Sequence, residues 1–152
     1  MDDAALMGAA LEQAALGLAE DEVPIGAIAV VDGEIVARAF WRLRAGLLAH
    51  PELVVLQQAN QRGLSLYTTL EPCLLCMAAA MFSFCERVVY ALESPTDGGT
   101  TIGEVWNPGE GSVRPYDFPT VLPGVRRDES AELVREFLRR NPDARWAQTL
   151  PV

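Results

Sequence analysis

The sequence has 152 residues, about the length of one ordinary domain, and half of them are hydrophobic, which is enough for a single sizeable core. The formal net charge of −9 disfavours nucleic acid as a partner, although negative charge also serves solubility. The sequence has no lysine, which excludes a mechanism through a lysine Schiff base. No apolar run approaches the about 20 residues of a membrane helix, and the acidic first residues lack the basic leader of a signal peptide, so we expect a cytoplasmic protein without a membrane segment.

The first predicted element is an amphipathic helix over residues 2–20, where leucine and alanine recur at helical spacing. A β-hairpin follows, because strand-like runs at 25–31 and 34–40 flank Asp32-Gly33, a favoured two-residue turn. The later elements are a loop at 41–49, helices at 51–61, 72–84 and 128–140, strands at 65–70, 87–92 and 119–125, a long loop at 94–117 and a tail at 141–152. This order predicts an α/β fold, a three-layer α/β/α sandwich whose mixed five-stranded sheet carries helices on both faces.

A close pair of cysteines lies in "TLEPCLLCMAAAM", residues 69–81. We expect Pro72 in the first turn of a helix, which places Cys73 and Cys76 on one face of the positively charged helix start, where thiolates are favoured. Such a pair can be a redox centre, half of a structural zinc site or part of a catalytic one. The third cysteine, Cys85, is expected to point away from the pair and to be buried as a small hydrophobic residue.

The single histidine lies in "LLAHPELVVL", residues 47–56. A residue before proline is disfavoured in helical conformation, so His50 is predicted to be the N-cap of a helix and Pro51 its first residue. His50 and two cysteines make three ligands with an open fourth position, which is the ligand number of a catalytic zinc. Glu52 would then lie beside the metal-activated water. Taken alone, His50 could be a hydrogen-bonded structural residue, and Glu52 could serve only the helix dipole.

His-x-Glu followed by Pro-Cys-x-x-Cys is the signature of zinc deaminases. The stretches "EVPIGAIAV", "SLYTTLEPCLLCMAAAM", "RVVYAL" and "GVRRDESAELVREFL" also look like segments of that family. The sequence therefore resembles the cytidine deaminase-like superfamily, and within it the branch of free-base cytosine deaminases, guanine deaminases and tRNA adenosine deaminases. The resemblance covers residues 5–140, which we take as one zinc-dependent deaminase domain, followed by the tail 141–152.

The resemblance implies one Zn²⁺ per chain, held by His50, Cys73 and Cys76. It also implies that Glu52 carries protons while zinc-activated water replaces an exocyclic amine, which leaves as ammonia. Relatives are usually dimers or higher oligomers, so a homodimer is expected from the resemblance alone.

The residues expected around the substrate depart from the family pattern. Pro51 lacks the backbone N–H that relatives direct at the bound base, and Trp41 stands near the place of a base-binding asparagine. Trp146, in a tail that resembles that of free-base cytosine deaminases, is a candidate for a lid over the active site, or it simply packs on the surface. Trp106 in the long loop is a weaker candidate of the same kind.

We therefore expect a hydrolase that deaminates a small amino-substituted heterocycle: a nucleobase, a nucleoside or a base analogue such as a modified pyrimidine or triazine. The alternatives are a tRNA adenosine deaminase, against which the acidic charge counts, and a catalytically silent zinc-bearing binding subunit, against which the intact Glu52 counts.

Overall fold

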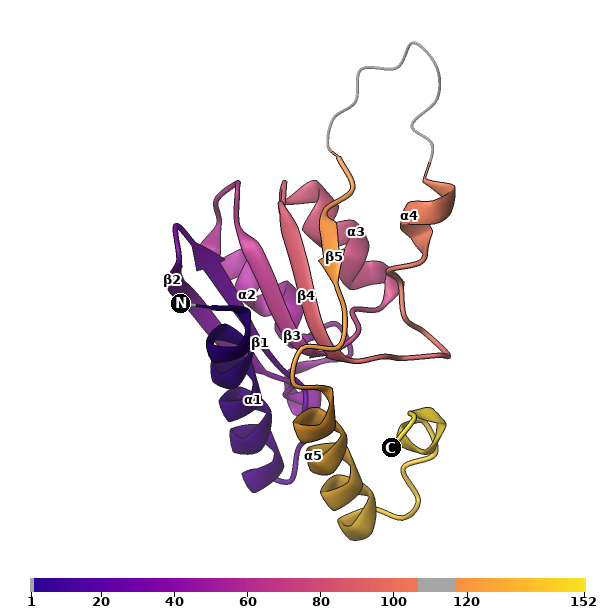
Figure 1. The fold of residues 1–152 in the computed structure, drawn as a ribbon. Coiled ribbons are helices and arrows are strands. Elements are labelled where there is room, and N and C mark those ends of the chain that lie inside the picture. The colour runs from indigo at the N-terminus through magenta and orange to yellow at the C-terminus, as the bar shows by residue number, and fades with distance from the viewer. Residues whose placement is uncertain (1, 107–116) are drawn as a thin grey trace.

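The computed structural model describes residues 2–106 and 117–152 and shows one mixed sheet in the order β2-β1-β3-β4-β5 (Figure 1). β1 pairs antiparallel with both β2 and β3, whereas β3, β4 and β5 run parallel to one another. The strands are β1 (Gly26–Val31), β2 (Glu34–Phe40), β3 (Ser65–Leu70), β4 (Arg87–Leu92) and β5 (Thr120–Leu122). The predicted five-stranded mixed sheet is confirmed.

The turn between β1 and β2 has the predicted chemistry. Asp32 and Gly33 adopt φ angles of 50° and 79°, so both central residues are in the left-handed region that a type I′ hairpin turn requires. The register places Val31 opposite Glu34, directly across this turn.

Helices cover both faces of the sheet. α1 (Asp3–Ala19) and α5 (Arg127–Arg140) lie on one face, and α2 (Pro51–Ala59) and α3 (Leu74–Phe82) lie on the other (Figure 1). Alternate residues of the central strands point to opposite faces of the sheet. In β3, Tyr67 packs with α1, whereas its neighbour Leu66 packs with α2 and α3. The fold is therefore the three-layer α/β/α sandwich that the sequence predicts.

The start of α3 differs from the prediction. Cys73 is the N-cap, with φ −66° and ψ 170°, and the helix begins at Leu74, so Pro72 precedes the helix instead of lying in its first turn. The cause is a contact from a distant segment: Cys73 forms an isolated β-bridge with Gly98, and the N–H of Gly99 donates a 2.7 Å hydrogen bond to the carbonyl of Pro72. These contacts keep the chain extended up to Cys73.

The predicted long loop over 94–117 contains a short helix, α4 (Ile102–Val105), and residues 107–116 of it lie outside the described residues. Two further turns of 3₁₀-helix occur in the predicted loop and tail, η1 (Leu43–Ala45) and η2 (Ala147–Thr149). Among the helices described here, none is both long and apolar enough to cross a membrane.

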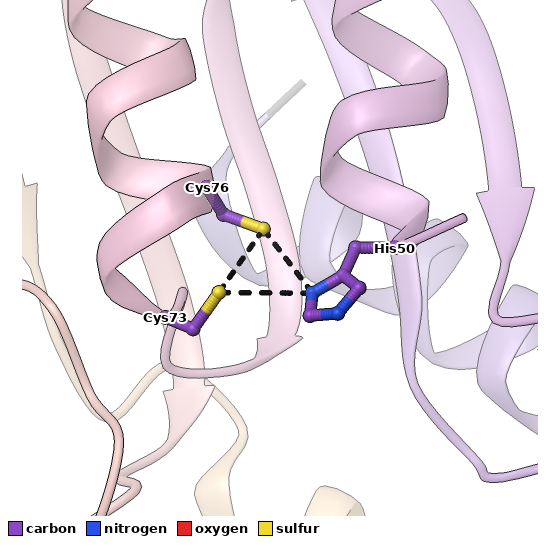
Figure 2. A group of neighbouring side chains, drawn as sticks. All are labelled: His50, Cys73 and Cys76. Carbon is purple, nitrogen blue, oxygen red and sulfur yellow. Dashed lines mark hydrogen bonds between the residues drawn. The ribbon is translucent and has the colours of Figure 1, made fainter. Parts of the chain in front are cut away.

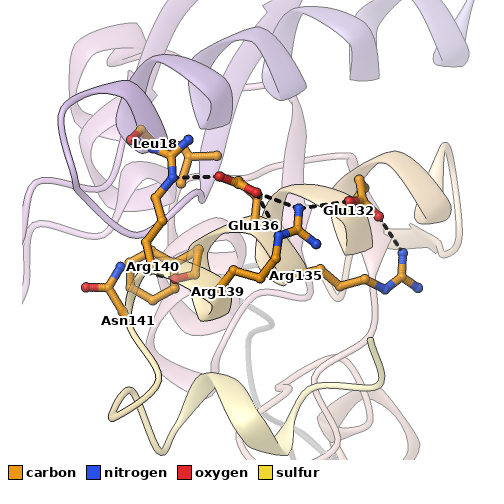
Figure 3. Close-up of polar contacts among 8 residues, drawn as sticks. Leu18, Glu132, Arg135, Glu136, Arg139, Arg140 and Asn141 are labelled. Carbon is orange, nitrogen blue, oxygen red and sulfur yellow. Dashed lines mark hydrogen bonds and ion pairs between the residues drawn. The ribbon is translucent and has the colours of Figure 1, made fainter.

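The end of α5 is tied to the end of α1. The exposed face of α5 carries glutamate–arginine pairs in which Glu136 binds both Arg139 and Arg140 (Figure 3). Exposed pairs of this kind contribute little to stability, because solvent screens the attraction between the charges. Arg140 also donates to the carbonyl oxygen of Leu18 at 3.4 Å, and the side chain of Asn141 donates to the carbonyl of Phe137. These bonds fix the point from which the C-terminal tail leaves α5.

Candidate active site and metal centre

The starts of α2 and α3 converge beside the carboxyl end of β3. His50 is the N-cap of α2 with an extended backbone (φ −60°, ψ 136°), and Pro51 is the first helical residue, as predicted. Cys73, the N-cap of α3, and Cys76, one turn further on, face the histidine ring (Figure 2). Both helices therefore direct their positive N-terminal ends at the same place, where anionic ligands are favoured.

The three ligand atoms form a compact triangle. Nδ1 of His50 lies 3.7 Å from Sγ of Cys73 and 3.4 Å from Sγ of Cys76, and the two sulfur atoms are 3.6 Å apart. Tetrahedral zinc with Zn–S bonds of about 2.3 Å and Zn–N bonds of about 2.0–2.1 Å requires ligand atoms roughly 3.5–3.8 Å apart. The triangle therefore fits zinc with little movement. It is the one group of three such residues within 2–106 and 117–152.

Cys85 lies away from this triangle. Its thiol is buried and donates to the carbonyl oxygens of Leu64 and Arg87, at 3.2 and 2.9 Å. The prediction that Cys85 is a buried small residue outside the metal site is confirmed.

The two metal-facing thiols have opposite tendencies to ionise. The hydrogen bond between Cys73 and Cys76 is the main cause that lowers the pKa of Cys73, to about 4, and the hydrogen bond with His50 lowers it further. The same bond to Cys73 is the main cause that raises the pKa of Cys76, and burial raises it further. The bond to Cys73 also raises the pKa of His50. A cation that binds all three atoms must therefore displace protons, so metal affinity should fall as pH falls.

Glu52 lies next to the triangle and is 4% exposed. The hydroxyl of Thr68 donates a 2.7 Å hydrogen bond to its Oε1, and its Oε2 lies 3.6 Å from Sγ of Cys76. Burial raises the pKa of Glu52, and the bond from Thr68 acts in the opposite direction. A carboxyl group with this environment suits repeated uptake and release of a proton.

A pocket of about 270 Å³ opens beside these groups. Its lining combines an aromatic face with acidic side chains: Ile25, Trp41, His50, Pro51, Glu52, Leu70, Glu71, Cys73, Asp97 and Trp146. The structure thus brings together the residues that the sequence predicts, with the exception of Trp106. That residue ends α4 and is not part of the pocket lining within the described chain.

The comparison with known protein families agrees with this geometry. Residues 1–92, which include both metal-facing motifs, match the cytidine and deoxycytidylate deaminase zinc-binding region. The chain belongs to this family. Zinc is therefore its cofactor, and the donor set of His50, Cys73 and Cys76 forms a suitable site for it.

Similar proteins include tRNA adenosine deaminases, and a guanine deaminase shares the fold. The tRNA-specific adenosine deaminase of Agrobacterium fabrum is 36% identical over 148 residues, which span 88% of this chain and 91% of that protein. A chain solved in a study of A-to-I editing by tRNA:A34 deaminases at the wobble position of transfer RNA is 34% identical, with a TM-score of 0.75 over 85% of this chain and 98% of that one. Guanine deaminase from Nitrosomonas europaea, 24% identical, shares the fold with a TM-score of 0.70 over 90% of this chain and 84% of its own.

Two tryptophans form the aromatic side of the deaminase pocket. The ring of Trp41 lies 4.8 Å from that of His50 and 6.1 Å from that of Trp146, measured between centroids. The indole N–H of Trp41 is buried and has no hydrogen-bond partner in the part of the chain that the structure describes. A buried donor without a partner is uncommon in native proteins, and a bound ligand or water is one way to satisfy it.

The tail of the deaminase is packed against its core. Trp146 contacts the ring of Phe137 at 6.4 Å between centroids, and Ala147 and Leu150 are buried. Arg127 donates to the carbonyl of Pro151 at 2.9 Å. The segment around Trp146 is therefore held in place as a wall of the pocket.

The prediction from sequence missed the two acidic pocket residues Glu71 and Asp97, as well as the apolar Ile25 and Leu70. Glu71 stands two positions before Cys73 in "TLEPC", and Asp97 lies in the glycine-rich loop after β4. The one available signal was their charge, which does not distinguish a pocket residue from a solvated one.

Proposed function

We propose that this protein is a zinc-dependent hydrolytic deaminase of a small amino-substituted heterocycle. In this proposal His50, Cys73 and Cys76 hold the zinc and leave its fourth position open. Zinc in a site of this kind supplies Lewis-acid activation of water. The distances of 3.4–3.7 Å between the ligand atoms support this assignment.

Glu52 is the proposed proton carrier. Thr68 occupies its Oε1, so Oε2, on the side of the metal-facing thiols, is the oxygen available for chemistry. Glu52 takes a proton from the attacking water and delivers it to a ring nitrogen of the substrate. It then transfers the second proton to the departing amine. The carbon exchanges its bond to nitrogen for one to oxygen, and one water is consumed for each ammonia released.

The size and lining of the pocket carry the proposal of a small substrate. Pockets for drug-sized ligands measure roughly 300–1,000 Å³, and this pocket of about 270 Å³ lies below that range. Trp41 and Trp146 offer flat faces on which a heterocycle can stack. Among the described residues, the lining contains no arginine, and the chain carries a net charge of −9, which does not favour a phosphate backbone.

Deamination of tRNA adenosine is the second candidate, because the similar proteins named above at 36% and 34% identity are associated with tRNA adenosine deamination. The two candidates differ in what must reach the zinc. A wobble adenosine has to enter with its ribose and phosphates attached, whereas a free heterocycle needs only the space beside Trp146.

The test is ammonia release by zinc-loaded protein from a panel of free nucleobases, nucleosides, aminotriazines and an RNA anticodon stem-loop with adenosine at the wobble position. We expect turnover of at least one small heterocycle, and loss of that turnover in Glu52→Ala with zinc retained. Deamination of the RNA without turnover of any free heterocycle would establish the second candidate. Zinc binding with no turnover of any compound would instead indicate a silent binding subunit.

A further inference from the structure

The loop after β4 is fixed in place by a buried carboxylate, that of Glu71. Oε2 of Glu71 accepts the N–H of Ser94 at 2.9 Å, and its Oε1 accepts both the N–H and the hydroxyl of Thr100. Glu71 is 8% exposed. Both of its oxygens are therefore used by the protein itself, although the residue belongs to the pocket lining.

Two glycines allow this loop to pack closely. A β-carbon at Gly98 would lie 2.4 Å from the carboxylate of Glu71, and one at Gly99 would lie 2.7 Å from the backbone of Leu74. The N–H of Gly98 donates back to the carbonyl of Ser94 at 2.9 Å, which closes a tight turn. Because both ends of the turn are held, the residue immediately before Gly98 has a defined position.

That residue is Asp97, which lines the pocket together with His50 and the two tryptophans. One carboxylate oxygen, Oδ1, accepts the hydroxyl of Ser94 at 2.5 Å. The structure gives the other oxygen no hydrogen-bond partner within residues 2–106 and 117–152. A carboxylate offers about four lone-pair sites, so Asp97 keeps most of its capacity to accept hydrogen bonds.

The other carboxylates among the described residues of the pocket lining are already assigned. Glu52 is the proposed proton carrier, Glu71 is satisfied by the loop, and Pro51 has no N–H to offer. Asp97 is an exposed residue of this lining, so water can satisfy its second oxygen, and an N–H of a bound ligand can replace that water with a charge-assisted hydrogen bond. The acceptor that remains for recognition is thus the carboxylate of Asp97.

We propose that Asp97 determines substrate specificity by accepting a hydrogen bond from a second exocyclic amino group of the heterocycle, distinct from the amine that is removed. This inference rests on the proposed deaminase function and narrows its substrate class to rings with a second donor, such as diamino-substituted pyrimidines, purines or triazines. A ring that presents a carbonyl oxygen at the same position meets a like-signed carboxylate and binds poorly.

The bond to Ser94 gives Asp97 a structural role as well, and one substitution separates the two roles. Asp97→Asn keeps an oxygen for the Ser94 hydroxyl but replaces the free oxygen with an NH₂ group, which donates instead of accepting. The substitution therefore preserves the turn, but it replaces a hydrogen-bond acceptor in the pocket with a donor. Asp143→Asn is the matched control, because Asp143 is an exposed carboxylate of the tail and does not line the pocket.

The experiment measures kcat/KM and calorimetric affinity of the zinc-loaded protein for two ligand pairs. 2,4-diaminopyrimidine and cytosine differ by an amino group against a carbonyl, and 2,6-diaminopurine and adenine differ by an amino group against hydrogen. We expect wild type to prefer the diamino member of each pair. Because a hydrogen bond to a charged group is stronger than a neutral one, Asp97→Asn should reduce that preference by about 10-fold. The preference should be unchanged in Asp143→Asn.

Wild-type protein without the diamino preference, or Asp97→Asn with the wild-type preference at normal thermal stability, would overturn the role of Asp97. Either result leaves the proposed function intact as long as some heterocycle is deaminated in a Glu52-dependent manner. Absence of turnover across the whole panel would overturn the proposed function itself, and the calorimetric ratio would still report on Asp97.

Discussion

Thr68 donates a 2.7 Å hydrogen bond to Oε1 of Glu52, and both side chains are buried. Thr68 belongs to β3 and Glu52 to the first turn of α2, so the carboxylate is oriented by the sheet as well as by its own helix. Because Oε1 accepts this bond, Oε2 is the carboxylate oxygen that faces the metal ligands, and it lies 3.6 Å from Sγ of Cys76. A precise orientation of this kind is what proton transfer to a fixed substrate requires.

Replacing Thr68 with valine should therefore slow catalysis without emptying the site. Thr68→Val keeps the side-chain shape and removes the donor, so we expect kcat to fall about 10-fold, which corresponds to about 1.4 kcal/mol, with KM and zinc content unchanged. Thr69→Val is the matched control, because the neighbouring hydroxyl accepts the N–H of Gly26 and lies away from the pocket. Steady-state kinetics with equal kcat for wild type and Thr68→Val would contradict the role of this bond.

Replacing Cys76 and replacing Cys85 should have different effects on metal content. Cys76→Ser should abolish stable zinc binding, because Sγ of Cys76 lies within 3.6 Å of both other ligand atoms. Cys85→Ser should keep about one zinc per chain, because its thiol binds backbone carbonyls elsewhere. Metal analysis after dialysis against a weak chelator checks both variants. A zinc-free Cys85→Ser protein, or full zinc in Cys76→Ser, would show that the metal site lies elsewhere.

Features set by neighbouring residues were predictable from the sequence, and those set by distant contacts were not. Pro51 keeps its neighbour His50 out of the helical conformation, and Asp32-Gly33 forms its turn without help from distant residues. The structure shows both features as predicted. The start of α3 was misplaced because its cause, the bridge between Cys73 and Gly98, comes from another segment.

The residues of the pocket also fall into those that could be predicted from the sequence and those that could not. The positions of Trp41 and Trp146 were expected from a family resemblance, and both line the pocket. Asp97 could not be found by this means, because its position depends on a hydrogen bond that joins Ser94 to Glu71, 23 positions earlier. Trp106 was predicted only from its residue type, and it lies outside the pocket lining.

Acid should weaken the fold through the pairing of Asp3 with Arg87. The hydrogen bond from Arg87, followed by that from Tyr67, lowers the pKa of Asp3 below its usual value. A carboxyl with a lowered pKa in the folded state stabilises the fold above its unfolded pKa of about 3.9, and this contribution is lost as pH falls further. The pair is partly exposed, so Asp3→Asn should lower the free energy of unfolding by only about 0.5–1 kcal/mol near neutral pH.

Urea unfolding at a series of pH values checks this, and the difference between wild type and Asp3→Asn should disappear as pH falls below about 4. The double variant Asp3→Asn/Arg87→Gln is the control, because the second substitution should add little once the pair is broken. A difference that grew as pH fell would contradict the assignment.

Trp146 should contribute to substrate affinity through its ring. Base–aromatic stacking is worth about 1–3 kcal/mol, so Trp146→Ala should raise KM about 10-fold with a smaller effect on kcat, whereas Trp146→Phe keeps a flat face and should recover most of the affinity. Deleting the tail after Arg140 is a poorer test, because it would also remove Ala147 and Leu150 from the core. Thermal unfolding of the alanine variant controls for stability, since Trp146 also contacts Phe137. If the KM of a stably folded Trp146→Ala protein equals that of wild type, this tryptophan is surface packing and the pocket closes in another way.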